Sequence, residues 1–172
     1  MIHQLENLCS LIEILGKFGI SLSIRKKRPA IFLSFRIGLD REDREMIDSL
    51  RKYFGGEVIE NKKVFLIIRK IEECYELSQF LKKCSFSLPS KKKKIEEWIR
   101  AVEIVRSMQH LRKEGFLELC RIKDEIYGSN FLRRFEGMIE RGELVFEKYL
   151  EKREKISKRK RFLSLLEKNM KL

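Results

Sequence analysis

Hydrophobic and polar side chains alternate through residues 19–37, and this pattern constrains the fold more than any other feature of the chain. Successive side chains of an extended strand point to opposite faces. One face is therefore apolar and the other polar and basic, on both sides of a basic turn at residues 26–29. The segment predicts a β-hairpin with one core face and one solvent face. The apolar positions are Ile20, Leu22, Ile24, Ile31, Leu33, Phe35 and Ile37.

Helical periodicity surrounds this hairpin. Apolar residues at helical spacing predict a first helix over about residues 4–16. Asp40 is expected to cap a helix that stops at Gly55-Gly56. A second hairpin is expected from residues 57–60 and 64–69, and further helices over about 71–83, 91–108 and 111–127. The order predicts an α+β fold in which helices back a four-stranded antiparallel sheet.

The composition changes after residue 127. We expect a domain over residues 1–127 and a basic, helical C-terminal extension over residues 128–172, with a helix break near Gly142. The extension ends in a basic run that includes Lys158, Arg159, Lys160 and Arg161. A run of this kind is either a solvated helix face or an arm that binds phosphates, and its composition favours neither.

The charge balance favours an anionic partner. The chain has 172 residues, with 39 Lys and Arg against 26 Asp and Glu, and a formal net charge of +13. Because 43% of the residues are hydrophobic, the chain can form a packed core and is not a disordered basic tail. The excess of positive charge makes nucleic acid the leading partner. No apolar run or signal-like N-terminus points to a membrane or to secretion, so a cytoplasmic or organellar (mitochondrial or chloroplast) location is expected.

Cysteine and histidine spacing gives no catalytic or metal motif. Cys9, Cys74, Cys84 and Cys120 contain no CxxC pair, and the two histidines are far apart. We therefore expect reduced, partly buried thiols, no zinc site and no cofactor. Trp98 lies at helical spacing with other apolar residues, so we expect it to pack in the core.

The order of these landmarks resembles a single-motif LAGLIDADG homing endonuclease over about residues 5–127. The matching features are the hairpin after a first helix, the segment FRIGLDREDREMIDSLRKYFGG, the second hairpin, and the segments LSQFLKKCSFSLPSKKKKIEEWIRAVEIV and HLRKEGFLELCRIKDEI. The resemblance implies an αββαββα saddle whose sheet places its polar face along a nucleic-acid duplex. The residues expected on this face or in the basic run are Ser21, Ser23, Arg25, Lys27, Arg28, Ser34, Arg36, Lys62, Lys63, Arg69, Lys158, Arg159, Lys160 and Arg161.

The catalytic motif of that family is not matched. The resemblance implies that the first helix ends in an acid followed by glycine, and that two such acids hold divalent metal. Aligning on Gly19 places Phe18 at the acid position, and aligning on Gly16 places Leu15 there. Neither side chain offers the oxygen ligands that Mg²⁺ requires. The sequence therefore predicts no catalytic residues and no bound metal, with Mg²⁺ relevant only if the protein is an active endonuclease.

Two other departures concern partners. Ile12 and Glu13 replace the small residues that let two helices of the family cross, so homodimerisation through the first helix is in doubt. Phe65 and Ile67 are expected on the nucleic-acid face, where they could stack on unpaired bases or pack against a protein.

Three functions stay open at this point. They are a nuclease-deficient binder of structured RNA or DNA (an intron maturase or an rRNA-associated factor), an active endonuclease that cuts double-stranded DNA, and a protein-interaction subunit of a ribonucleoprotein complex.

Overall fold

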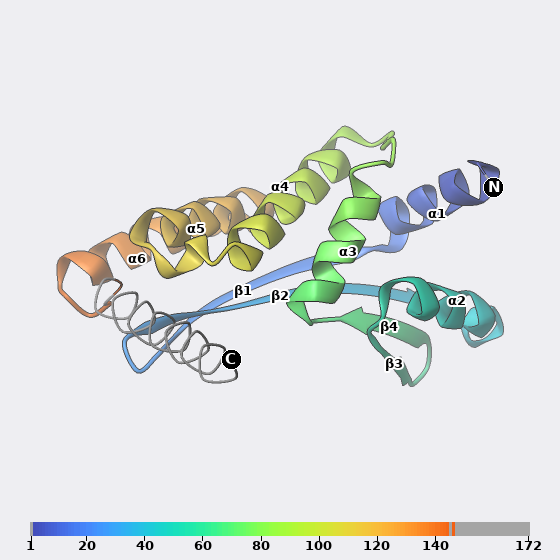
Figure 1. Ribbon diagram of the computed structural model, residues 1–172, viewed down its shortest axis with the longest axis horizontal. Coiled ribbons are helices and arrows are strands. Elements are labelled where there is room, and N and C mark those ends of the chain that lie inside the picture. The colour runs from blue at the N-terminus through green and yellow to red at the C-terminus, as the bar shows by residue number, and fades with distance from the viewer. Residues whose placement is uncertain (1, 145, 147–172) are drawn as a thin grey trace, which may run out of the picture.

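The computed structural model describes residues 2–144 and 146, with side chains from residue 6 onward. The chain has the expected α+β fold, with the sheet covered by helices on one side (Figure 1). The elements are α1 (Ile2–Leu15), β1 (Lys17–Arg25), β2 (Arg28–Leu39), the short helix η1 (Arg41–Asp43), α2 (Arg44–Phe54), β3 (Glu57–Glu60), β4 (Val64–Ile68), α3 (Ile71–Leu81), α4 (Pro89–Arg106), the short helix η2 (Gln109–Leu111), α5 (Lys113–Tyr127) and α6 (Phe131–Glu140).

The four strands form an antiparallel sheet in the order β1-β2-β4-β3. The first hairpin is closed by a two-residue turn, because Arg25 pairs with Arg28. Lys26 and Lys27 fill this turn with φ angles of 51° and 62°. Turns with two positive φ values match the twist of a hairpin, but they usually carry glycine or asparagine. This turn therefore holds two lysines at the tip of the hairpin in a conformation that their side chains disfavour.

The core lies between the apolar face of the sheet and helices α3, α4 and α5 (Figure 1). Trp98 of α4 is fully buried, and its indole Nε1–H donates a hydrogen bond to the Gly19 carbonyl at 3.3 Å. Its role in packing is therefore confirmed. Gly16 joins α1 to β1 where a Cβ would lie 2.4 Å from the Ile12 carbonyl oxygen and 2.9 Å from the Phe35 ring. Only glycine permits this close approach between the helix and the sheet.

Helix α6 shares the core of the preceding helices. The Phe116 ring of α5 contacts the rings of Phe135 and Phe146, at centroid distances of 5.0 and 5.5 Å. Asp124 of α5 accepts hydrogen bonds from the Phe131 and Leu132 backbone N–H groups at 2.7 and 2.8 Å. The start of α6 is therefore fixed by a carboxylate of the helix before it. Gly142, where the helix was expected to break, has a φ of 68° just beyond the end of α6.

Two sequence-based expectations about local structure were wrong. Asp40 makes no side-chain capping bond; η1 precedes α2, and the Asp40 carboxylate instead pairs with Lys63 at 3.1 Å. Cys9 and Cys84 are not reduced but form a disulfide that links α1 to the segment after α3. They are 75 residues apart in sequence, and only the packing of α1 brings their Cα atoms to 5.6 Å. Cys74 and Cys120 are buried free thiols, as expected.

Candidate nucleic-acid interface

The face of the sheet that points away from the helices carries polar and basic side chains. We call this surface the outer face and define it by the strand positions that alternate with the buried ones. Cross-strand pairing places Gly19 opposite Ser34, Ser21 opposite Phe32 and Arg25 opposite Arg28. In the next row, Lys17 pairs with Arg36 and Arg36 pairs with Ile67. The alternation in sequence therefore produces a single surface, because strand pairing aligns the polar positions of β1 and β2.

The predicted contact residues within the described part of the chain lie on this face or at its ends. Exposed positions are Ser21, Arg25, Lys27, Arg28, Arg36, Lys62, Lys63 and Arg69, while Ser23 and Ser34 are partly buried. Lys62 and Lys63 lie in the turn between β3 and β4 and not on the strands. Arg69 follows β4 and pairs with Glu57 at 3.6 Å. Lys158, Arg159, Lys160 and Arg161 lie outside the described residues.

Phe65 and Ile67 of β4 lie on the outer face as expected, opposite Gly38 and Arg36, but both side chains are largely covered. Ile67 is 9% exposed, and Phe65 is half-buried. The Phe65 ring lies against Gly38, where a Cβ would be 2.3 Å from a ring carbon. The guanidinium carbon of Arg36 lies 3.8 Å from the centroid of the same ring. Phe65 therefore supports Arg36 through a cation–π contact and is not itself available for stacking.

The end of α1 decides between the two possible positions for the family's acid. The helix ends at Leu15, and β1 begins at Lys17, so Phe18 lies in the strand and not at the helix end. Its ring contacts Phe35 and Trp98 at centroid distances of 5.2 and 5.1 Å on the core side of the sheet. Leu15, which precedes Gly16, is 37% exposed. The alignment on Gly16 is therefore the one that agrees with the helix boundary.

Glu13 is turned into the protein and does not face a partner helix. Its side chain is 3% exposed, and Ile12 is fully buried. One carboxylate oxygen accepts the Leu88 backbone N–H at 2.6 Å, and the other accepts the Ser87 hydroxyl at 3.1 Å. Burial acts to raise the pKa of Glu13, but these hydrogen bonds and the charge of Lys91 outweigh it and hold the pKa below its ordinary value. The expectation that Glu13 projects outward and repels a partner helix was wrong.

The end of α1 does not fit a divalent metal ion. Leu15 and Phe18 carry no oxygen ligands, and both oxygens of Glu13 are engaged with residues 87 and 88. Within residues 2–144 and 146, no group of three or more His, Cys, Asp or Glu side chains is placed to hold a metal. A hard cation such as Mg²⁺ requires several oxygen ligands. We therefore derive no metal-dependent step from these residues.

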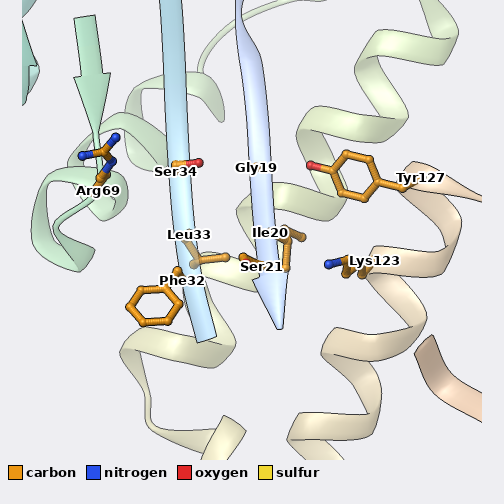
Figure 2. A pocket seen from close by; sticks show the side chains of 9 residues that line it. All are labelled: Gly19, Ile20, Ser21, Phe32, Leu33, Ser34, Arg69, Lys123 and Tyr127. Atoms are coloured by element: carbon orange, nitrogen blue, oxygen red, sulfur yellow. The ribbon is translucent and has the colours of Figure 1, made fainter. Parts of the chain in front are cut away.

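Helix α5 places two residues beside the outer face that sequence reasoning missed. Lys123 and Tyr127 lie beside the edge strand β1 and help to line an open hollow with a volume of about 520 Å³ (Figure 2). The Tyr127 hydroxyl donates a hydrogen bond to the Phe18 carbonyl at 2.5 Å. The Lys123 ammonium lies 3.9 Å from the centroid of the Phe131 ring. No pattern in the sequence predicts this arrangement, because it depends on how α5 docks against β1.

Comparison with known proteins identifies the fold. Neither a family model nor a curated protein matches the sequence. Among solved structures, the homing endonuclease I-TnaI matches with a TM-score of 0.64 and 21% identity, over 80% of this chain and 96% of that one. The LAGLIDADG meganuclease I-AabMI, bound to uncleaved DNA, matches with a TM-score of 0.63 and 25% identity, over 73% of this chain and 45% of that one. I-SmaMI, bound to its DNA target in the presence of calcium ions, matches with a TM-score of 0.65, 19% identity and the same coverage.

These matches confirm the resemblance at the level of the fold: the chain has the LAGLIDADG homing-endonuclease fold. It spans nearly all of I-TnaI and about half the length of the other two proteins. In the part of the chain that the structure describes, no helix is long and apolar enough to cross a membrane.

Proposed function

We propose that this protein binds nucleic acid through the outer face of its sheet and does not cleave it by the metal-dependent reaction of homing endonucleases. The single observation that carries the proposal is the end of α1. Leu15 and Phe18 occupy the two candidate positions of the acid, and Glu13 is buried with both of its oxygens hydrogen-bonded. A surface suited to phosphate is thus combined with a centre that lacks metal ligands.

The charge of the outer face supports binding to a phosphate backbone. Arg25, Arg28 and Arg36 are exposed on it, and Lys17 lies in the same row as Arg36. Cations on such a surface displace condensed counterions when they contact phosphates, so binding should weaken steeply with salt. The DNA bound to I-AabMI and I-SmaMI supports nucleic acid as the partner by analogy of fold.

We further propose structured RNA as the target, in a role such as intron maturation or association with rRNA. A role in folding RNA requires a basic surface but no metal ligands, whereas cleavage of DNA requires both. The basic residues of the C-terminal extension fit this proposal, because they would enlarge the area that contacts phosphates. Duplex DNA is the alternative target.

One experiment tests both proposals. The full chain is titrated against a folded intron or rRNA fragment and against a DNA duplex of matched length, with Mg²⁺ present, and binding and strand cleavage are scored in the same samples. We expect salt-dependent binding without cleavage, with RNA bound more tightly than DNA. Metal-dependent double-strand cutting would overturn the first proposal and would assign the activity of the solved relatives to this chain. Tighter binding to DNA would overturn only the choice of RNA.

A further inference from the structure

Phe32 is an exposed aromatic side chain on the outer face, in the middle of the β1–β2 ladder. Its side chain is 51% exposed, and it lies opposite Ser21 in the β1–β2 ladder, between the Gly19–Ser34 and Ser23–Ala30 pairs. Phe65 differs from it, because it is half-buried and covered by Arg36. Exposing a large aromatic ring to water on a basic surface forgoes the stabilisation that burial would provide. Single exposed apolar side chains are common on protein surfaces, so the role of Phe32 is decided by what surrounds it.

The surroundings of Phe32 match the chemistry of a nucleotide. Phe32 borders the hollow of about 520 Å³, whose rim also carries the Ser21 and Ser34 side chains (Figure 2). Arg69, from the end of β4, lies on one side of the two strands, and Lys123 and Tyr127 of α5 lie on the other. The guanidinium carbon of Arg25 lies 5.2 Å from the centroid of the Phe32 ring. The hollow thus combines an aromatic platform, hydroxyl groups and cations on two sides.

We propose that this hollow binds an unpaired nucleotide, with Phe32 stacking on the base and with Arg69 and Lys123 facing the flanking phosphates. The proposal rests on the proposed function and specifies its substrate class, which is a nucleic acid that presents at least one base outside a helical stack. In a duplex, a protein can reach only the edge of a paired base through the groove, because the flat faces of the base are covered by the neighbouring bases. A stacking platform can therefore be used only by a base that has left the stack.

The test compares two nucleic acids that differ by one nucleotide. One is a fully paired duplex, and the other contains a single unpaired adenine; both are made as RNA and as DNA. In a second set, the unpaired adenine is replaced by 2-aminopurine, whose fluorescence falls when it stacks on an aromatic ring. We expect the full chain to bind the bulged duplex roughly tenfold more tightly than the paired one. We also expect it to quench the fluorescent base.

Three variants assign this preference to Phe32. Phe32→Ala should abolish the quenching and bring the affinities for the bulged and paired duplexes to the same value, and Phe32→Tyr should retain the preference and the quenching because it keeps the ring. Tyr53→Ala is the matched control, since Tyr53 is a 79% exposed aromatic residue on α2, outside the outer face. Circular dichroism of each variant establishes that it is folded.

The outcomes separate this inference from the proposed function. Equal affinity of the wild-type protein for paired and bulged duplexes would overturn the inference and leave the proposed function standing. The inference would also be overturned, and the proposed function left standing, if Phe32→Ala weakened the paired and bulged complexes equally. That outcome is expected if Phe32 contacts a thymine methyl group in the major groove. If none of the four duplexes is bound in a salt-dependent way, both the inference and the proposed function are overturned. A preference confined to the RNA or to the DNA pair identifies which nucleic acid supplies the unpaired base.

Discussion

The Glu13 carboxylate at the end of α1 accepts the backbone N–H of Leu88, one residue before α4 begins, at 2.6 Å. The Ser87 hydroxyl donates to the other oxygen of the same carboxylate. These bonds connect the first helix to the fourth over more than 70 residues of sequence. Close by, the Cys9–Cys84 disulfide joins the same two regions covalently. The end of α1 is therefore used to fix the fold, at the position where the family resemblance implies a metal-binding acid.

Replacing Glu13 should destabilise the protein in a pH-dependent way. Glu13→Ala removes the acceptor of two hydrogen bonds, and we expect the free energy of unfolding to fall by about 2 kcal/mol. Because the pKa of Glu13 is lowered in the folded state, its contribution is fully present above the ordinary pKa of a glutamate and is lost as the pH falls through the lowered value. Urea unfolding of the wild type and of Glu13→Gln across acidic pH measures this, and the variant should lose less stability on acidification.

Glu42→Gln is the control for this measurement, since Glu42 is an exposed carboxylate on η1. It should leave both the stability at neutral pH and its decline in acid unchanged. Wild-type and Glu13→Gln curves that run parallel through the acidic range would show that Glu13 has no lowered pKa.

Placing an acid at each candidate position should lower stability by very different amounts. Phe18→Asp would set a carboxylate against Phe35 and Trp98, so we expect the free energy of unfolding to fall by about 3 kcal/mol or more. Leu15→Asp is at an exposed helix end and should cost about 1 kcal/mol or less. Thermal unfolding monitored by circular dichroism compares the two variants. A Phe18→Asp protein as stable as Leu15→Asp would contradict the packing of Phe18 described above.

Removing the disulfide should lower stability without changing the fold. A cross-link that closes a long loop stabilises a protein by about 3 kcal/mol. The free energy of unfolding of the Cys9→Ser/Cys84→Ser double variant should therefore fall by about that amount, so that it unfolds at a lower denaturant concentration. Thiol titration of the unfolded wild type should count two thiols before reduction and four after it. In the native state, Cys74 and Cys120 should not react at pH 8, because burial raises the pKa of each thiol to about 12. Four reactive thiols in the unreduced, unfolded protein would show that the bridge does not form.

Relieving the turn at the hairpin tip should stabilise the protein. Lys26→Asn/Lys27→Gly introduces residues that favour positive φ at both turn positions, and we expect the free energy of unfolding to rise by about 1 kcal/mol. The same change at Lys62 and Lys63 removes equal charge from the other hairpin turn. Comparing the chemical unfolding of the two variants separates the conformational effect from the loss of charge. If Lys26→Asn/Lys27→Gly left the stability unchanged or lowered it, the prediction would be contradicted.

Neutralising Arg36 should weaken nucleic-acid binding mainly through the phosphates. Arg36→Ala removes one cation from the outer face, so the slope of log affinity against log salt should become shallower by about 1. Lys94→Ala is the matched control, because Lys94 is exposed on α4, on the opposite side of the sheet. Fluorescence anisotropy at several salt concentrations measures both slopes. If the slope changed equally in Arg36→Ala and Lys94→Ala, binding would depend on the total charge of the protein and not on the outer face.

The sequence by itself determined the elements of the fold and the polar character of one sheet face. Alternation from Ile20 to Ile37 defines which side chains of the first hairpin are buried, because side-chain direction in a strand has a period of two. Glycines 55, 56 and 142 marked the ends of helices by their positive φ angles. Resemblance of the ordered landmarks to the LAGLIDADG fold was also readable from the chain alone, and the solved structures agree with it.

Only the tertiary structure decided how distant residues combine. The Cys9–Cys84 bridge, the burial of Glu13 and the docking of Lys123 and Tyr127 beside β1 all depend on contacts between segments that local periodicity cannot relate. Periodicity likewise placed Phe65 and Phe32 on the same face without distinguishing them. Packing made the difference: Phe65 lies over Gly38 and beneath Arg36, while Phe32 keeps half of its surface in water. Local pattern fixes the direction of a side chain, but its exposure depends on what the rest of the chain places above it.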